Sequence, residues 1–131
     1  MPTRIRGLAE IVLWVHDLNK SLYFYRDILG LTVISPATMT NPIFLEAGGA
    51  PLGLPQMIVL VQLPREAGPF ITPRTLHHLA LEISPKDFDD EQARLKTLGF
   101  EVRMGQHPVV PSRTMYISDP DDNEVELICK A

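Results

Sequence analysis

Residues 10–31 read EIVLWVHDLNKSLYFYRDILGL, a sequence that predicts a strand followed by a helix. Its first six residues are rich in β-branched side chains and alternate between two faces, which predicts a strand over 10–15. One face of this strand is made of Ile11, Leu13 and Val15, and the other of Glu10, Val12 and Trp14. The more apolar face is expected to meet a helix, which leaves Glu10 on the opposite face.

A helix is predicted directly after this strand. Asp17 or Asn19 can cap its start, and Gly30 is typical of the residue just beyond a helix end. Apolar residues recur between them at the spacing of one helix face, at Leu18, Leu22, Tyr25 and Leu29. Three more strands are predicted, at 31–34, 43–45 and 57–63, so the first half has the order β-α-β-β-β.

The second half repeats this order. The segment HHLALEI, residues 77–83, predicts a strand, and a helix capped at Ser84 or Asp87 then ends at Gly99. Three strands complete the half, at 100–103, 115–118 and 125–129. Placing Glu10 on His78 gives an offset of 68 residues, and placing Gly30 on Gly99 gives 69, which indicates an internal repeat.

The repeat predicts one domain over residues 1–131, built of two modules at about 8–64 and 75–130 with a linker at 65–74. Each module alone would leave one face of its sheet uncovered, so the two are expected to pack together. The alternative is a ferredoxin-like α+β domain whose halves resemble each other by chance.

The composition is that of an ordinary globular protein. The chain has 131 residues, of which 45% are hydrophobic and 21% charged, and a net charge of −4. This mildly acidic balance argues against a nucleic-acid partner. The single Cys129 excludes an internal disulfide and is compatible with the cytoplasm, and the apolar run near the N-terminus is too short to span a membrane.

Three side chains could hold a metal ion. Glu10 and His78 each stand at the start of a first strand, on the face away from the helix. Glu126 takes the same face of the last strand, because Val125 and Leu127 would face the helix. One imidazole and two carboxylates suit a divalent ion such as Fe, Mn, Ni, Zn or Mg. Three protein ligands leave positions open for water and substrate, as in catalytic sites.

Three segments resemble the vicinal oxygen chelate superfamily: residues 10–31, residues 77–83 and YISDPDDNEVEL at 116–127. That superfamily includes glyoxalase I, extradiol dioxygenases, methylmalonyl-CoA epimerase, and fosfomycin and bleomycin resistance proteins. The resemblance implies an α+β fold in which two βαβββ modules form a cupped mixed sheet with helices on the outside. It also implies one divalent metal ion held by Glu10, His78 and Glu126, a small-molecule substrate and a homodimer.

The resemblance also suggests roles and shows departures. Tyr116 occupies the place of the tyrosine that hydrogen-bonds the reacting species in extradiol dioxygenases. Asp122 stands where the family usually has glycine, and Glu10 replaces the first histidine of the dioxygenase triad. Two carboxylates around a divalent ion give a neutral site, which should attract an anionic catecholate less strongly than a positive one. A loosely bound Glu10 could instead act as a base beside a chelated carbonyl.

A fourth ligand position, on the last strand of module one, falls on Val59 or Val61, and both side chains are apolar. Gln56 or Gln62 would replace it only if the strand register were shifted by one residue.

The remaining candidates are weaker. Trp14 shares a strand face with Glu10 and could contact substrate. Arg113 could bind a substrate carboxylate or phosphate, against the alternative of a solvated loop arginine. Alternation sends His77 to the face opposite His78, where it is interpreted as a structural or solvent residue.

Two functions remain open. The first is a metal-dependent lyase, isomerase or dioxygenase, with Glu10 and Tyr116 as catalytic residues. The alternative is a non-catalytic binding protein of the bleomycin-resistance type, which sequesters a small molecule in a pocket that includes Trp14.

Overall fold

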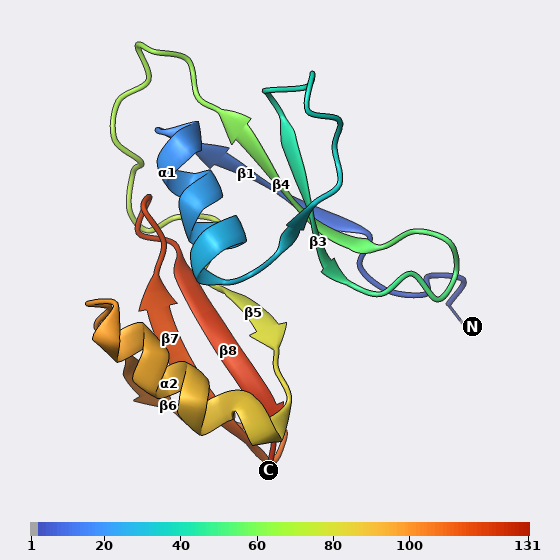
Figure 1. Cartoon of the computed structure of the whole chain (residues 1–131), viewed down its shortest axis with the longest axis vertical. Coiled ribbons are helices and arrows are strands. Elements are labelled where there is room, and N and C mark those ends of the chain that lie inside the picture. Colours follow the sequence, from blue (N-terminus) through green and yellow to red (C-terminus); the bar gives the residue numbers. More distant parts are fainter. Residues whose placement is uncertain (1–2) are drawn as a thin grey trace. The chain divides into compact units, whose positions relative to one another are not determined.

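A computed structural model describes residues 3–131, and in it the chain divides into two compact units (Figure 1). The first unit ends at Ala67 and the second begins at Gly68, within the residues predicted as the linker. Each unit contains one four-stranded mixed sheet and one helical segment. The predicted α+β class with two βαβββ modules is therefore confirmed.

The first module contains, in chain order, β1 (Glu10–Val15), α1 (Leu18–Leu22), the π-helix η1 (Tyr23–Ile28), β2 (Thr32–Val33), β3 (Ile43–Gly48) and β4 (Gln56–Gln62). Its sheet has the order β1-β4-β3-β2. β1 runs parallel to β4, and the other neighbouring strands are antiparallel.

The second module contains β5 (Leu79–Glu82), the 3₁₀-helix η2 (Pro85–Asp87), α2 (Phe88–Thr97), β6 (Arg103–Gly105), β7 (Ser112–Ser118) and β8 (Glu124–Lys130). Its order, β5-β8-β7-β6, repeats that of the first sheet with the same parallel and antiparallel pairs. The repeated topology supports the internal repeat in the sequence. β6 begins at Arg103, where the sequence predicted a strand to end.

The first helical segment begins as predicted but buries a different stripe. Asp17 caps it, since its Oδ1 accepts a hydrogen bond from the Lys20 amide at 3.1 Å. Beyond the first turn, hydrogen bonds reach back five residues, as from the Leu29 amide to the Phe24 carbonyl at 2.9 Å. This wider winding changes which side chains share a face. Tyr25 of the predicted stripe is therefore buried together with Ser21, Phe24 and Ile28, whereas the predicted Leu18, Leu22 and Leu29 are only partly buried.

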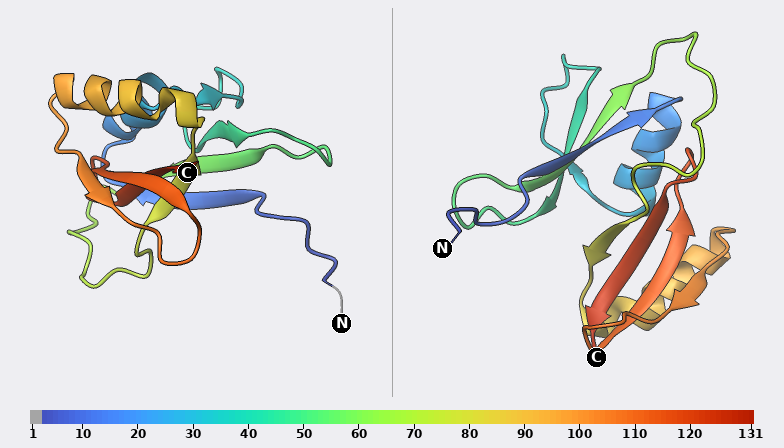
Figure 2. Two further views of the ribbon diagram at one scale, coloured as in Figure 1. Left: turned by 90° about the horizontal axis from the view of Figure 1, so that it is seen from below. Right: turned by 180° about the vertical axis from the view of Figure 1, so that it is seen from behind.

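Each sheet packs its helix against one face only. In the second module, Phe88 and Leu95 of α2 are fully buried, as are Met115 and Val125 of the sheet beneath them. Figure 2, seen from below, shows α2 along one side of this sheet. In the first module, Leu13 and Val15 point inward, and Val12 and Trp14 on the opposite face are more than half exposed. The face of each sheet opposite its helix is called here the helix-free face.

Candidate metal centre on the second module

The register of β8 places Glu126 at the centre of the second module's helix-free face. Glu126 lies opposite Tyr116 on β7 and opposite Ala80 on β5. Its chain neighbours Val125 and Leu127 are buried on the other side of the strand, because successive residues of a strand alternate. The sequence prediction that Glu126 points away from the helix is therefore consistent with this geometry.

His78 and Glu126 form a close pair on this face. The Nε2 atom of His78 lies 3.2 Å from Oε1 of Glu126, and their side chains are 36% and 2% exposed. No donor among residues 3–131 hydrogen-bonds the buried Oε2 of Glu126. A buried carboxylate oxygen without a donor is costly. The pair thus presents an imidazole nitrogen and an unsatisfied carboxylate oxygen, two donors suited to a divalent cation.

Tyr116 completes this part of the site. Its ring centroid lies 6.0 Å from that of His78, with the two planes at 70°. Burial raises the pKa of the Tyr116 hydroxyl above its ordinary value, and the negative charge of Glu126 raises the pKa further. At neutral pH the hydroxyl therefore stays protonated and can donate a hydrogen bond.

Gly105 makes room for the Tyr116 ring. A Cβ atom at position 105 would overlap the ring and would lie 2.8 Å from Oγ1 of Thr114. Thr114 lies opposite Gly105, and its hydroxyl is buried with no hydrogen-bond partner among the described residues. No sequence pattern indicates either residue, because the contact depends on how β6 and β7 pair.

A second polar group on this face was also not predicted. Arg103 lies opposite Tyr116 in the register of β6 and β7. Its guanidinium donates through Nη1 to Oε1 of Glu124 and through Nη2 to Oγ of Ser118, the latter at 3.2 Å. A positive group therefore lies on β6, two strands away from Glu126, and it is held by the start of β8 and the end of β7.

His77 also belongs to this part of the molecule. It is exposed, yet its Nδ1 atom lies 2.8 Å from Nδ1 of His78, and the ring centroids are 5.0 Å apart. Both histidines precede β5, whose ladder begins at the Leu79–Val125 pair. His77 therefore lies outside the paired strand, and the alternation that predicted its side chain on the opposite face does not hold there.

The turn between β7 and β8 holds the start of the strand that carries Glu126. Oδ1 of Asp119 accepts hydrogen bonds from the Asp121 and Asn123 amides at 2.9 and 2.8 Å, and its Oδ2 accepts one from Asn123 Nδ2 at 2.9 Å. Asp122 has a φ of 62°, the left-handed conformation that favours glycine. This conformation explains why the resembled family usually has glycine at this position.

Arg113 lies away from these residues. Its Nη2 atom donates to Oδ1 of Asp89 at 2.8 Å, and its guanidinium lies 4.3 Å from the centre of the Phe88 ring. Both partners belong to α2, and Arg113 and Tyr116 are three residues apart, hence on opposite faces of β7. The structure does not bring Arg113 together with His78, Glu126 and Tyr116.

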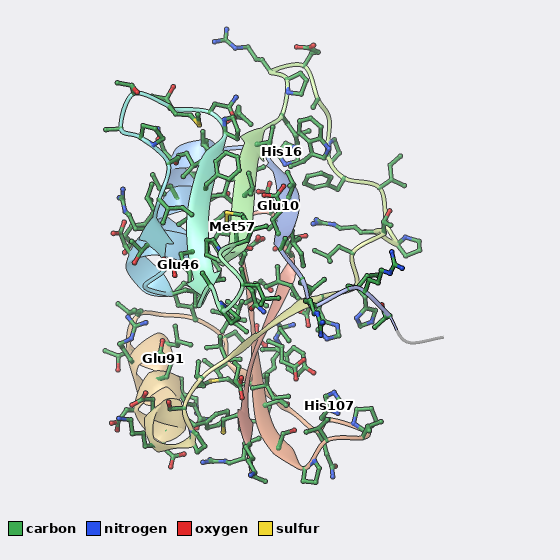
Figure 3. All side chains as sticks on the ribbon, turned by 90° about the vertical axis from the view of Figure 1, so that its right-hand side faces the viewer. Glu10, His16, Glu46, Met57, Glu91 and His107 are labelled. Carbon is green, nitrogen blue, oxygen red and sulfur yellow. The ribbon has the colours of Figure 1, made fainter. Side chains whose placement is uncertain are left out.

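The predicted residues of module one lie on its own helix-free face. Glu10 faces Met57 across the β1–β4 pair, and Met57 faces Glu46 on β3 (Figure 3). Trp14 lies further along β1, opposite Val61, and is 56% exposed. Among residues 3–131 the structure forms no cluster of three His, Cys, Asp or Glu side chains that could hold a metal ion. The structure brings two of the three predicted ligands together, His78 and Glu126. The role of Glu10 as a ligand stays a prediction.

The strand registers show which residue of module one is equivalent to Glu126. Ala80, two residues after His78, lies opposite Glu126. Val12, two residues after Glu10, lies opposite Val59, so Val59 is the counterpart of Glu126. The amide of Gln62 is occupied, because it donates to the His16 carbonyl at 2.7 Å and accepts from the Leu18 amide at 2.9 Å. The position equivalent to Glu126 is therefore the apolar Val59, and neither Gln56 nor Gln62 occupies it.

Comparisons with known proteins found proteins of similar sequence and fold. The model of the Glyoxalase/Bleomycin resistance protein/Dioxygenase superfamily matches residues 7–127. Fosfomycin resistance protein FosX of Listeria innocua is 30% identical over 125 residues, which span 94% of this chain and 89% of the relative. Metallothiol transferase FosB of Staphylococcus epidermidis is 27% identical over 94% of this chain and 83% of its own.

Solved structures show the same fold. A glyoxalase/dioxygenase from Nostoc punctiforme is 27% identical, with a TM-score of 0.76 over 100% of this chain and 95% of that one. FosX from Listeria monocytogenes, also 27% identical, has a TM-score of 0.68 over 97% and 95% of the two chains. Over residues 3–131, none of the helices has the length and apolar character that a membrane crossing requires.

Proposed function

Because the chain belongs to the Glyoxalase/Bleomycin resistance protein/Dioxygenase superfamily, we propose that it is a metal-dependent enzyme. Its substrate would be a small oxygenated molecule that binds a divalent ion through two neighbouring oxygens. The observation that carries the proposal is the buried Glu126, whose Oε2 has no hydrogen-bond donor among the described residues and whose Oε1 faces Nε2 of His78. The relatives named for fosfomycin resistance, metallothiol transfer and catechol dioxygenation support this class of chemistry without fixing the substrate.

The residues present fit a divalent ion. His78 would bind it through Nε2 and Glu126 through a carboxylate oxygen, which would satisfy the atom that is now without a partner. Glu10 is proposed as the third ligand because it holds the place in module one that His78 holds in module two. Two carboxylates and an imidazole favour the harder metals among Fe, Mn, Ni, Zn and Mg.

When bound, the ion would polarise the substrate oxygens and stabilise negative charge that develops on them. Tyr116 would donate a hydrogen bond to one of these oxygens, which its raised pKa permits at neutral pH. If Glu10 is only loosely held, its carboxylate would take the proton from the carbon beside the bound carbonyl. Arg103 would attract an anionic group of the substrate towards the same face.

Metal analysis of protein purified without chelators tests the proposal. We expect about one equivalent of a divalent transition metal or Mg²⁺ in the wild type and a strong loss in His78→Ala and Glu126→Gln. His16→Ala, an exposed histidine of module one, is the matched control and should retain the metal. Wild-type protein that takes up no divalent metal, even when Mn²⁺ or Zn²⁺ is added, would contradict the proposal.

A second function is favoured by the other module. The helix-free face of module one exposes Val12 and Trp14, and Val59 occupies its fourth ligand position. An apolar face with an aromatic side chain suits a protein that binds and sequesters a small apolar or aromatic molecule without turnover. Quenching of the single tryptophan by such a compound, equal in wild type and His78→Ala, would favour this function.

The proposal includes a homodimer, which the resemblance implied. Light scattering coupled to size-exclusion chromatography should give about twice the chain mass of 14.7 kDa. A monomer at micromolar concentration would remove this part of the proposal and leave the metal centre to be judged separately.

A further inference from the structure

His78 uses both of its ring nitrogens in the structure. Nε2 faces Oε1 of Glu126 at 3.2 Å, and Nδ1 faces Nδ1 of His77 at 2.8 Å. A neutral imidazole carries one N–H donor and one acceptor nitrogen. The short distance between the two Nδ1 atoms requires that one of them donates and the other accepts.

Two arrangements of neutral rings satisfy the Nδ1–Nδ1 contact. In the first, His78 donates from Nε2 to Glu126, and its Nδ1 accepts from Nδ1–H of His77. In the second, Nδ1–H of His78 donates to Nδ1 of His77, and the Nε2 lone pair of His78 faces the Glu126 carboxylate, a contact between two acceptors that a cation would relieve. Only the second leaves Nε2 able to bind a cation.

We propose that His77 is a positioning residue that sets the tautomer of His78 and thereby makes Nε2 available to a divalent cation. The inference rests on the proposed function for the cation, and on the His77–His78 contact for the mechanism. Histidines that bind metals commonly donate the other ring N–H to a fixed acceptor, which orients the ring and raises its basicity. Here that acceptor is a second imidazole, which can also donate when the cation is absent.

The exchange between the two arrangements balances. One proton passes from Nδ1 of His77 to Nδ1 of His78 along their hydrogen bond. The Nε2 proton of His78 leaves to water, and Nε2 of His77 takes one from water. Both rings remain neutral and the pair keeps its proton count.

The position of His77 supports this role over a chance contact. The two residues lie before the first hydrogen-bonded pair of β5, so their side chains are free to approach each other. The rings meet edge to face at 73°, and the His77 ring is exposed, so its Nε2 can exchange protons with water. The buried Glu126 holds the opposite nitrogen, so the His78 ring is fixed from both sides.

Long-range proton–nitrogen NMR of the full chain, ¹⁵N-labelled and metal-free, reports which ring nitrogens carry protons. The pH should be about 8, above the ordinary histidine pKa of about 6.5. We expect His77 as the Nδ1–H tautomer and His78 as the Nε2–H tautomer. In His78→Phe, His77 should return to the Nε2–H form that free side chains prefer. An unchanged His77 tautomer in that variant would overturn the inference, whatever the protein does with metals.

Zn²⁺ titration, followed by calorimetry and by the same spectra, tests whether His77 makes Nε2 of His78 available to a cation. We expect Zn²⁺ to move the His78 proton to Nδ1 in wild type. His77→Phe keeps a ring but no nitrogen, and should bind Zn²⁺ about 10-fold more weakly. His77→Asn, which places a polar atom near the position of Nδ1, should recover most of the affinity. Equal affinity in wild type and His77→Phe would overturn the inference, whereas wild type that binds no Zn²⁺ but shows the coupled tautomers would overturn the proposed function alone.

Discussion

The two modules have the same strand order and equivalent registers, yet their helix-free faces carry different chemistry. At the centre of the second face Glu126 pairs with Tyr116 and Ala80, and the equivalent positions of the first face are Val59, Phe44 and Val12. A carboxylate and a phenol in one module thus correspond to a valine and a phenylalanine in the other. The scaffold is repeated, but the buried carboxylate and the phenol at these positions occur in one copy.

The difference separates what stabilises the fold from what forms the site. Val59 is buried among apolar neighbours, as expected for a core residue. Glu126 is equally buried at the equivalent position, where a carboxylate with one oxygen lacking a hydrogen-bond donor opposes stability. Glu126 is unfavourable for folding at a position where its counterpart, Val59, is apolar. This difference indicates that Glu126 has a role in binding.

Exchange of Glu126 for its module-one counterpart should have the largest effect. In Glu126→Val we expect metal affinity to fall by more than about 100-fold, because a ligand is removed. The metal-free protein should become more stable by about 1–2 kcal/mol, because a buried carboxylate is replaced by an apolar group. Calorimetric metal titration and urea unfolding of the metal-free protein measure the two effects.

Glu124→Gln is the control, since Glu124 lies on the same face but is paired with Arg103. It should leave metal affinity unchanged. A metal-free Glu126→Val that is less stable than wild type would identify the carboxylate as a structural group and contradict the comparison.

Gly105→Ala tests the packing that only the second module contains. The added methyl group would overlap the Tyr116 ring and approach Thr114, so we expect a loss of about 1–3 kcal/mol in the free energy of unfolding. Gly49→Ala in the first module, where a Cβ meets no atom within 4 Å, is the control and should change stability little. Combining Gly105→Ala with Tyr116→Ala should cost less than the sum of both changes. Additive costs would show that the ring does not depend on Gly105.

The Tyr116 hydroxyl, which Phe44 lacks in module one, gives a pH-dependent signal. Its pKa is raised by burial and then by the charge of Glu126, so Glu126→Gln should lower the pKa while leaving it above the ordinary value of about 10. Ultraviolet titration of wild type minus Tyr116→Phe isolates this tyrosine. An unchanged pKa in Glu126→Gln would show that burial alone causes the shift.

The same shift has a consequence for stability. A pKa raised in the folded state means that the folded protein holds the proton where the unfolded chain has lost it. Stability should therefore fall as the pH rises from about 10, the unfolded value, through the folded-state pKa. Glu126→Gln should reduce this fall, which unfolding measurements at alkaline pH can follow.

Local pattern was enough to predict the order of the elements and the approach of His78 to Glu126. The alternation around Glu10 and His78, the repeat offset and the acidic turn before Glu126 gave the β-α-β-β-β order and the His78–Glu126 pair. The buried stripe of the first helix was missed because η1 winds with a five-residue hydrogen-bond spacing. The contacts of Gly105 with Tyr116 depend on the pairing of β6 and β7, which no local pattern shows. The His77–His78 contact does not follow from strand alternation, because both residues precede the strand ladder.

The hairpin turns of the two modules also differ, and substitutions there should change stability least. The β3–β4 connection of module one has glycine at its positive φ, Gly53 at 95°, whereas the β7–β8 turn of module two has Asp122 at 62°. An L-residue pays about 1 kcal/mol in this conformation, less for aspartate, so Asp122→Gly should raise the free energy of unfolding by about 0.5 kcal/mol. Gly53→Ala should lower the free energy of unfolding. Metal affinity should stay constant in both variants, because neither residue is a proposed metal ligand. Destabilisation by Asp122→Gly would mean that the aspartate side chain stabilises the turn by more than its backbone strain costs.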